Sequence, residues 1–177
     1  PAEINPEYSW NYEAGFRRNL GVFRGEVVGY FNDYANLTGQ CTFSSGCDSE
    51  DLDQQFNGGR ANIYGAELLT GLTVPVTPAL KIPLELTYTY TDSVFLTDFN
   101  SGFAQFGRVE RGDSLPYVAR HQGRFQVGTE HERMRLGVGV SYRGRMLDNA
   151  GRFDDEAVPN IPELLLVDLG GHVNIAR

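Results

Sequence analysis

Five arginines in the second half of the chain are the residues whose chemistry points most directly to a ligand. They lie in stretches rich in Gly, Asp, Asn and Ser, or at the edges of those stretches: Arg108, Arg111, Arg120, Arg145 and Arg152. A guanidinium group keeps its charge and presents a fork of donors that binds an oxyanion bidentately. We therefore interpret the five as candidate contacts for an anionic, carboxylate-rich ligand. Pairing with loop acids such as Glu110 and Asp113 is the alternative.

Cys41 and Cys47 are the only cysteines, and five residues separate them. This spacing within a loop-like stretch favours a disulfide, as in proteins of oxidising compartments, over two free thiols. Closing so short a loop would stabilise the fold by about 2 kcal/mol on loop-entropy grounds. No histidine lies near the pair, so we expect no zinc site, which needs three or four ligands.

The other reactive residue types form no catalytic or metal-binding pattern. The acidic run at 154–156 lacks the alternating spacing of a calcium loop. The three histidines have no partner at helical or hairpin spacing, and no serine stands in the Gly-x-Ser-x-Gly setting of a hydrolase. We therefore expect no enzyme activity, no metal and no cofactor.

Charge and hydropathy exclude two further classes. A formal net charge of -8 gives no basic footprint, so nucleic acid is not expected as a partner. The longest unbroken apolar run, Leu164 to Val167, is far shorter than the ~20 residues of a spanning helix. A mean hydropathy of -0.33 nevertheless fits a membrane β-barrel, in which only alternate residues face lipid.

Apolar and polar residues alternate at period two in seven stretches, which predicts seven strands with one apolar and one polar face. Aromatic residues gather toward the ends of the apolar stripes, as in the wall of a membrane barrel. Representative residues expected on the apolar face are Phe16, Phe31, Leu86, Val138 and Leu169. Those expected on the polar face include Glu13, Glu26, Glu85, Arg135 and Asp168.

The predicted strands cover residues 7–18, 22–36, 60–74, 80–93, 119–131, 133–147 and 163–176. Short connections alternate with long ones at 37–59, 94–118 and 148–162, and the short link at 74–80 carries two prolines. Short turns at one end and long loops at the other are typical of bacterial outer-membrane barrels. The fold class we predict is all-β: a segment of an antiparallel up-and-down transmembrane β-barrel. Because seven strands cannot close antiparallel, we expect about seven strands of a larger barrel.

Several motifs in this order resemble the C-terminal barrel of TonB-dependent receptors, most closely those of the ferric citrate receptor type. They are residues 6–17 (PEYSWNYEAGFR), 27–37 (VVGYFNDYANL), 64–68 (YGAEL), 84–92 (LELTYTYTD) and 112–122 (GDSLPYVARHQ). Ala119 replaces the proline usual in the last motif. The resemblance runs through nearly the whole chain.

The resemblance implies a barrel of about 22 strands filled by a plug and energised through TonB. Residues 1–177 would then be a partial barrel domain, with the plug and the final strands absent. The implied function is active transport of a ferric chelate, a siderophore or ferric citrate, across the outer membrane. The implied partners are that chelate, outer-membrane lipid and lipopolysaccharide, and TonB through the missing plug. For the rim arginines, lipopolysaccharide phosphates are a further alternative partner.

Two other classes of protein are alternatives. A soluble β-sandwich or jelly-roll module, such as a lectin-like domain, would bury its aromatic stripe against a second sheet. A barrel enzyme would need a catalytic set facing one side, which the sequence does not contain. The fragment alone in water is expected to self-associate through its open edges and its apolar face.

Overall fold

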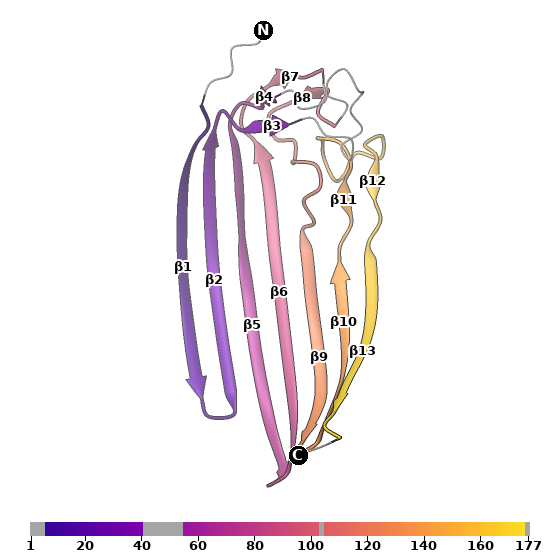
Figure 1. The fold of residues 1–177 in the computed structure, drawn as a ribbon. Helices are drawn as coiled ribbons and strands as arrows, with labels where there is room; N and C mark the ends of the chain where they lie inside the picture. The colour runs from indigo at the N-terminus through magenta and orange to yellow at the C-terminus, as the bar shows by residue number, and fades with distance from the viewer. Residues whose placement is uncertain (1–5, 41–54, 103–104, 176–177) are drawn as a thin grey trace.

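Seven long antiparallel strands form one sheet in the computed structural model (Figure 1). They are β1 (Tyr8–Leu20), β2 (Phe23–Ala35), β5 (Ala61–Thr77), β6 (Leu80–Phe95), β9 (His121–His131), β10 (Met134–Arg143) and β13 (Leu164–Val173). Each pairs with the next in this order, which is an up-and-down topology. The structure describes residues 6–40, 55–102 and 105–175, and within them no helix is long and apolar enough to cross a membrane. The seven predicted strands are confirmed.

The three long connections all lie at one end of the sheet, as predicted (Figure 1). Each carries a small two-stranded sheet that the sequence did not predict. The pairs are β3 (Thr38–Gln40) with β4 (Gln55–Asn57), β7 (Phe99–Asn100) with β8 (Arg108–Val109), and β11 (Met146–Leu147) with β12 (Asn160–Ile161). We call this the loop end, and the opposite end of the sheet the turn end.

Several strand ends differ from the predicted ones, and two of the differences follow directly from the pairing. The link expected at 74–80 is shorter, because β5 continues through Pro75 to Thr77. Strand β2 pairs with β5 only as far as Leu72, so no strand on that side requires the amide hydrogen that Pro75 lacks. At the other site, β10 ends at Arg143 instead of running to 147, and the Gly144 amide donates to the carbonyl oxygen of His121 at 2.7 Å.

The register sorts the side chains into two faces. One cross-strand row joins all seven strands and is entirely apolar: Leu20, Phe23, Leu72, Leu84, Val127, Val138 and Leu169. The adjacent row contains no apolar side chain: Asn19, Arg24, Gly71, Glu85, Gln126, Gly139 and Asp168. Cross-strand partners share a face, so these rows define an apolar face and a polar face. The predicted segregation of the two stripes is confirmed.

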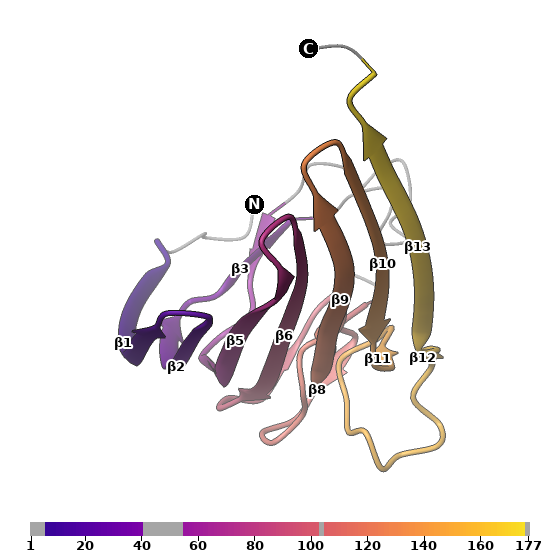
Figure 2. The same cartoon turned by 90° about the horizontal axis from the view of Figure 1, so that it is seen from below.

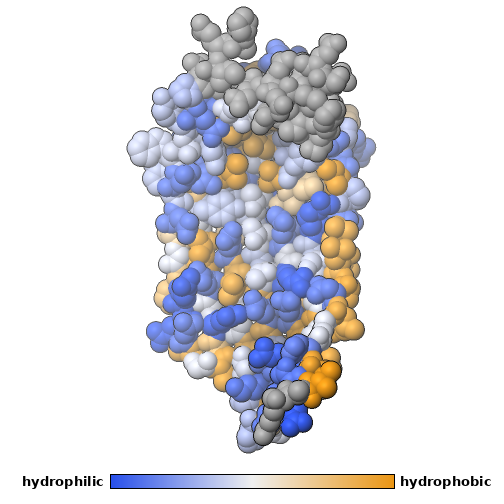
Figure 3. All heavy atoms as spheres, in the orientation of Figure 1, coloured by the Kyte–Doolittle hydropathy of each residue, from blue (hydrophilic) through white to orange (hydrophobic). Residues whose placement is uncertain are grey.

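The sheet is curved, and its concave side is polar. Seen from below, the strands stand side by side along an open arc (Figure 2). The side turned to the viewer in Figure 3 is mostly hydrophilic over the strands, with hydrophobic side chains along its edge. A hollow of about 480 Å³ on this side is lined by Glu85, Gln126 and Asp168 among others. A polar concave side and an apolar convex side are the arrangement of a membrane-barrel wall.

The apolar face lies bare. Tyr8, Trp10 and Tyr12 are 63%, 70% and 60% exposed, and no second sheet of the described residues covers them. A β-sandwich would bury these rings, so the soluble-sandwich alternative is wrong for this fold.

The buried core of the described residues is small and lies at the loop end. Ala61, Phe95 and Val109 are at most 1% exposed, and Phe95 meets Phe99 edge-on with ring centroids 5.3 Å apart. Leu37, Phe99, Phe106, Leu115 and Ala150 pack around this cluster. Residues from all three long loops therefore form one apolar cluster, which fixes the loops on the end of the sheet.

Candidate functional site

Ion pairs on the polar face connect strands that are not neighbours. Nη2 of Arg24 on β2 lies 2.8 Å from Oε2 of Glu85 on β6, across β5. Nη2 of Arg124 on β9 likewise lies 2.9 Å from Oδ1 of Asp168 on β13, across β10. Such links hold the polar lining in a defined arrangement, although each exposed pair contributes little energy by itself.

Glycine in the intervening strand gives these links their clearance. A Cβ added at Gly71 would come within 2.6 Å of Nε of Arg24, and one added at Gly139 within 2.7 Å of Nη2 of Arg124. The 2.6 Å hydrogen bond between the hydroxyls of Tyr30 and Thr91 passes over β5 in the same way, at Gly65. This role was not predicted from the sequence, although each glycine interrupts a polar stripe, which is a recognisable signal.

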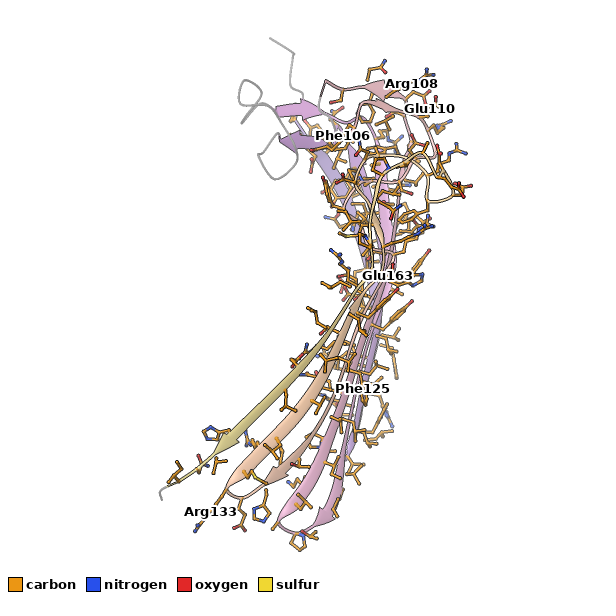
Figure 4. The ribbon with its side chains drawn as sticks, turned by 90° about the vertical axis from the view of Figure 1, so that its right-hand side faces the viewer. Phe106, Arg108, Glu110, Phe125, Arg133 and Glu163 are labelled. Carbon is orange, nitrogen blue, oxygen red and sulfur yellow. The ribbon has the colours of Figure 1, made fainter. Side chains whose placement is uncertain are left out.

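The five predicted arginines divide into two groups. Arg108 and Arg111 belong to the second long loop, whose tip stands at the loop end in Figure 4. Nη2 of Arg108 lies 3.0 Å from Oε1 of Glu110, which is the predicted alternative of pairing with a loop acid. Nε of Arg111 donates to the carbonyl oxygen of Leu96 at 2.9 Å.

Arg120, Arg145 and Arg152 line one pocket of about 620 Å³ together with Gly112, Ser114, Phe153 and Asp154. We call this the arginine pocket. The guanidinium carbons of Arg120 and Arg145 lie 4.1 and 5.7 Å from the centre of the Phe153 ring, so both cations make cation–π contacts with the same ring. Arg145 also donates through Nη2 to the carbonyl oxygen of Phe153 at 2.9 Å. Phe153 was not among the predicted site residues, and nothing in its sequence setting marks it.

The arginine pocket borders the apolar face. Tyr90 shares the row of Ala66 and His121 on that face, and its hydroxyl donates to Oδ2 of Asp92 at 3.3 Å. Nε of Arg120 lies 3.1 Å from Oδ1 of the same carboxylate. The Arg120 guanidinium is therefore linked through Asp92 to the aromatic end of the apolar face.

His121 belongs to this aromatic group. Its Nδ1 lies 2.7 Å from the Tyr88 hydroxyl, and its ring is 5.4 Å from that of Tyr90. Among the described residues, no group of three or more His, Cys, Asp or Glu side chains could hold a metal ion. Cys41 and Cys47 lie outside the described residues, so their disulfide stays a prediction.

The fold and the two faces define the chain as a wall segment of an up-and-down β-barrel. The sequence profile of the β-barrel of TonB dependent receptor-like proteins matches residues 2–175. The chain therefore belongs to the TonB-dependent receptor β-barrel family. No curated protein matches it.

Solved structures share the fold. The copper transporter OprC superposes with a TM-score of 0.64 at 16% identity, over 99% of this chain and 24% of its own. A mutant of the ferric enterobactin receptor PfeA from Pseudomonas aeruginosa gives a TM-score of 0.58 at 21% identity, over 97% of this chain and 24% of its own. A second PfeA mutant, in complex with enterobactin, gives a TM-score of 0.58 at 20% identity, over 97% and 24%. The chain thus spans about a quarter of the length of these proteins.

Proposed function

We propose that this chain is part of the wall of a bacterial outer-membrane receptor that imports a ferric chelate. TonB would supply the energy through a plug elsewhere in the protein. The observation that carries the proposal is the pair of adjacent rows across all seven strands, one wholly apolar and one without any apolar side chain. Lipid on one side and a water-filled or plugged interior on the other require that pattern. Family membership supports the same reading.

Iron is the favoured cargo for two reasons. The ordered motifs of the chain resemble receptors of the ferric citrate type, and one of the structural neighbours is a ferric enterobactin receptor. Citrate is rich in carboxylates, and its ferric complexes are anionic. We propose that Arg108 and Arg111 meet this anion as it arrives. Arg108 is largely exposed, and Arg111 has no carboxylate at ion-pair distance among the described residues.

Uptake of radiolabelled ferric citrate by cells that carry the full-length receptor as their sole iron receptor tests the proposal. Uptake should be saturable and should stop when tonB is deleted. The Arg108→Gln, Arg111→Gln double variant should raise the KM for uptake by about tenfold, because two charge-assisted contacts are lost. Arg133→Gln is the matched control, because Arg133 stands at the turn end (Figure 4). Import of copper but of no ferric chelate would contradict the proposal.

A further inference from the structure

The apolar cluster of the loops lies on the polar side of the sheet. Phe95 and Glu85 are separated by an even number of steps along β6, and the pairing of β6 with β5 is regular between them. Both side chains therefore point to the polar face. Phe95 and its β5 partner Ala61 are fully buried, and the rings of Phe99 and Phe106 lie 5.3 and 6.3 Å from that of Phe95. The second long loop thus folds inward and covers the loop end of the polar face.

Two aromatic rings anchor the tip of this loop. Phe99 of β7 is paired with the buried Val109 of β8, and the ring of Phe106 lies 6.3 Å from that of Phe99. Successive side chains of a strand point to opposite sides, so Arg108 points away from the cluster that holds Val109. Its side chain is 79% exposed (Figure 4). The buried rings therefore fix the position of an exposed cation.

Arg111 is held by the residues at the end of β6. Its backbone amide donates to Oδ1 of Asp98 at 2.6 Å, and its Nε donates to the carbonyl oxygen of Leu96 at 2.9 Å. The next amide, of Gly112, donates to the carbonyl oxygen of Phe95 at 2.9 Å. Backbone and side chain of Arg111 are thus both tied to the segment that carries the aromatic cluster.

The third long loop is attached to the second at two places. Ser114 and Gly151 form a bridge, in which the Ser114 amide donates to the Gly151 carbonyl oxygen at 2.7 Å. The amide of Ala150 donates to the carbonyl oxygen of Gln105 at 2.8 Å, and Ala150 also packs against the aromatic cluster. Relative motion of the two loops would break these bonds and expose apolar surface.

Tyr117 forms a further connection between the loops, and its backbone is strained. Its φ of +60° is one that a bulky side chain rarely adopts. Its amide donates to the carbonyl oxygen of Leu147 in β11 at 2.9 Å, and its hydroxyl is hydrogen-bonded to Asp148. Such strain persists only where the surrounding contacts hold the residue in place. The stem of the second loop is therefore fixed to the third.

We propose that the second and third long loops form one rigid body, fixed to the polar side of the wall by Phe95, Phe99 and Phe106. This body holds Arg108 and Arg111 in place before any ligand arrives, so Phe99 and Phe106 are positioning residues. Preorganised contacts spare the ligand the cost of ordering a loop. The rigid body follows from the contacts alone, and only the role of the two arginines rests on the proposed function.

The distance between spin labels at Asn100 and Glu156 in the full-length receptor tests the rigid body. Both residues are exposed, one in each loop, and Cys41 and Cys47 would be replaced by serine. We expect one narrow distance distribution that ferric citrate leaves unchanged. Phe106→Ala should broaden it, because the ring that holds the β7–β8 hairpin is lost. Phe106→Leu should keep it narrow, because leucine still fills most of the space.

Phe125→Ala is the matched control, since it removes the same ring from the apolar face of β9, away from the loops (Figure 4). It should leave the distribution narrow. A broad distribution in the parent would overturn the proposal, and so would a shift of the distance on addition of ferric citrate. Equal distributions in Phe106→Ala and Phe125→Ala would overturn the anchoring role of Phe106.

Uptake kinetics test the positioning of the arginines. Phe106→Ala should raise the KM for ferric citrate uptake by about fivefold without changing the maximal rate, and Phe106→Leu should restore the parent KM. An unchanged KM together with a broadened distance distribution would overturn the positioning role. If the parent imports no ferric chelate, the proposed function fails, whereas the label distances still decide whether the two loops are one body.

Discussion

Gly71 of β5 lies directly between Arg24 and Glu85 in one cross-strand row, and the ion pair of these two side chains passes over it. The Nη2 to Oε2 distance is 2.8 Å, although the two residues belong to strands that are not neighbours in the sheet. Glycine here has a definite structural role: its missing side chain lets charges two strands apart meet on the polar face.

Gly71→Ala should therefore behave differently from an alanine placed at an unobstructed glycine. In a strand, alanine is normally favoured over glycine by about 0.5–1 kcal/mol. Gly170 also lies on the polar face, and nothing lies within 4 Å of a Cβ added there, so Gly170→Ala should show that gain. Gly71→Ala should forgo it, because the new methyl group displaces Arg24 and weakens an exposed pair of up to about 1 kcal/mol. The free energy of unfolding in urea measures the difference, and equal gains at both sites would contradict the role of Gly71.

Leu86→Arg should strongly impair insertion of the full-length receptor into a bilayer. Leu86 is near the middle of β6 on the apolar face, where an arginine costs about 2–4 kcal/mol in lipid. Thr89→Arg is the control on the polar face of the same strand, where Thr89 pairs with Glu67 and a cation meets a carboxylate. Folding into lipid vesicles, followed by the gel mobility of the folded form, compares the two variants. Equal effects would mean that the two faces do not meet different solvents.

The seven strands and their faces could be predicted because both follow from local alternation. In the segment after Lys81, the face of each apolar residue fixes the faces of its neighbours, because successive side chains of a strand point to opposite faces. Some predicted strand boundaries were wrong because they depend on pairing between strands. Pro75, for example, is tolerated in β5 because the pairing of β5 with β2 stops at Leu72, before the proline. The loop strands were missed for a related reason. Two or three residues, such as Arg108 and Val109 of β8, carry no periodic signal.

The candidate site was predicted only in part. Arginine chemistry identified all three cations of the arginine pocket, but the packing of Arg120 and Arg145 against Phe153 depends on how two long loops pack, which the sequence does not encode locally. The link from Arg120 to Tyr90 through Asp92 was equally hidden. It connects Arg120, and with it the arginine pocket, to the aromatic end of the apolar face.

The loop end should respond to alkaline pH through Tyr117. Burial, followed by a hydrogen bond to Asp148, raises the pKa of the Tyr117 phenol above its ordinary value of 10.0. The fold thus favours the neutral phenol, so the stabilisation is complete below pH 10.0 and is lost as the pH rises through the raised pKa. Subtracting the tyrosinate absorbance titration of Tyr117→Phe from that of the parent should isolate a transition above pH 10.0. A transition at or below that value would contradict the assignment.

The most direct test of the barrel-wall interpretation is a cysteine scan of β10 in the full-length receptor in lipid, with Cys41 and Cys47 replaced by serine. Each of the residues 134–143 would carry a spin label in turn, and its collisions with a lipid-soluble and a water-soluble relaxing agent would be measured. A barrel wall requires strict alternation: we expect labels at Leu136, Val138 and Val140 to meet the lipid-soluble agent, and labels at Gly137, Gly139 and Ser141 not to meet it. Labels at Leu136, Val138 and Val140 that meet neither agent, or that meet the water-soluble one, would contradict it.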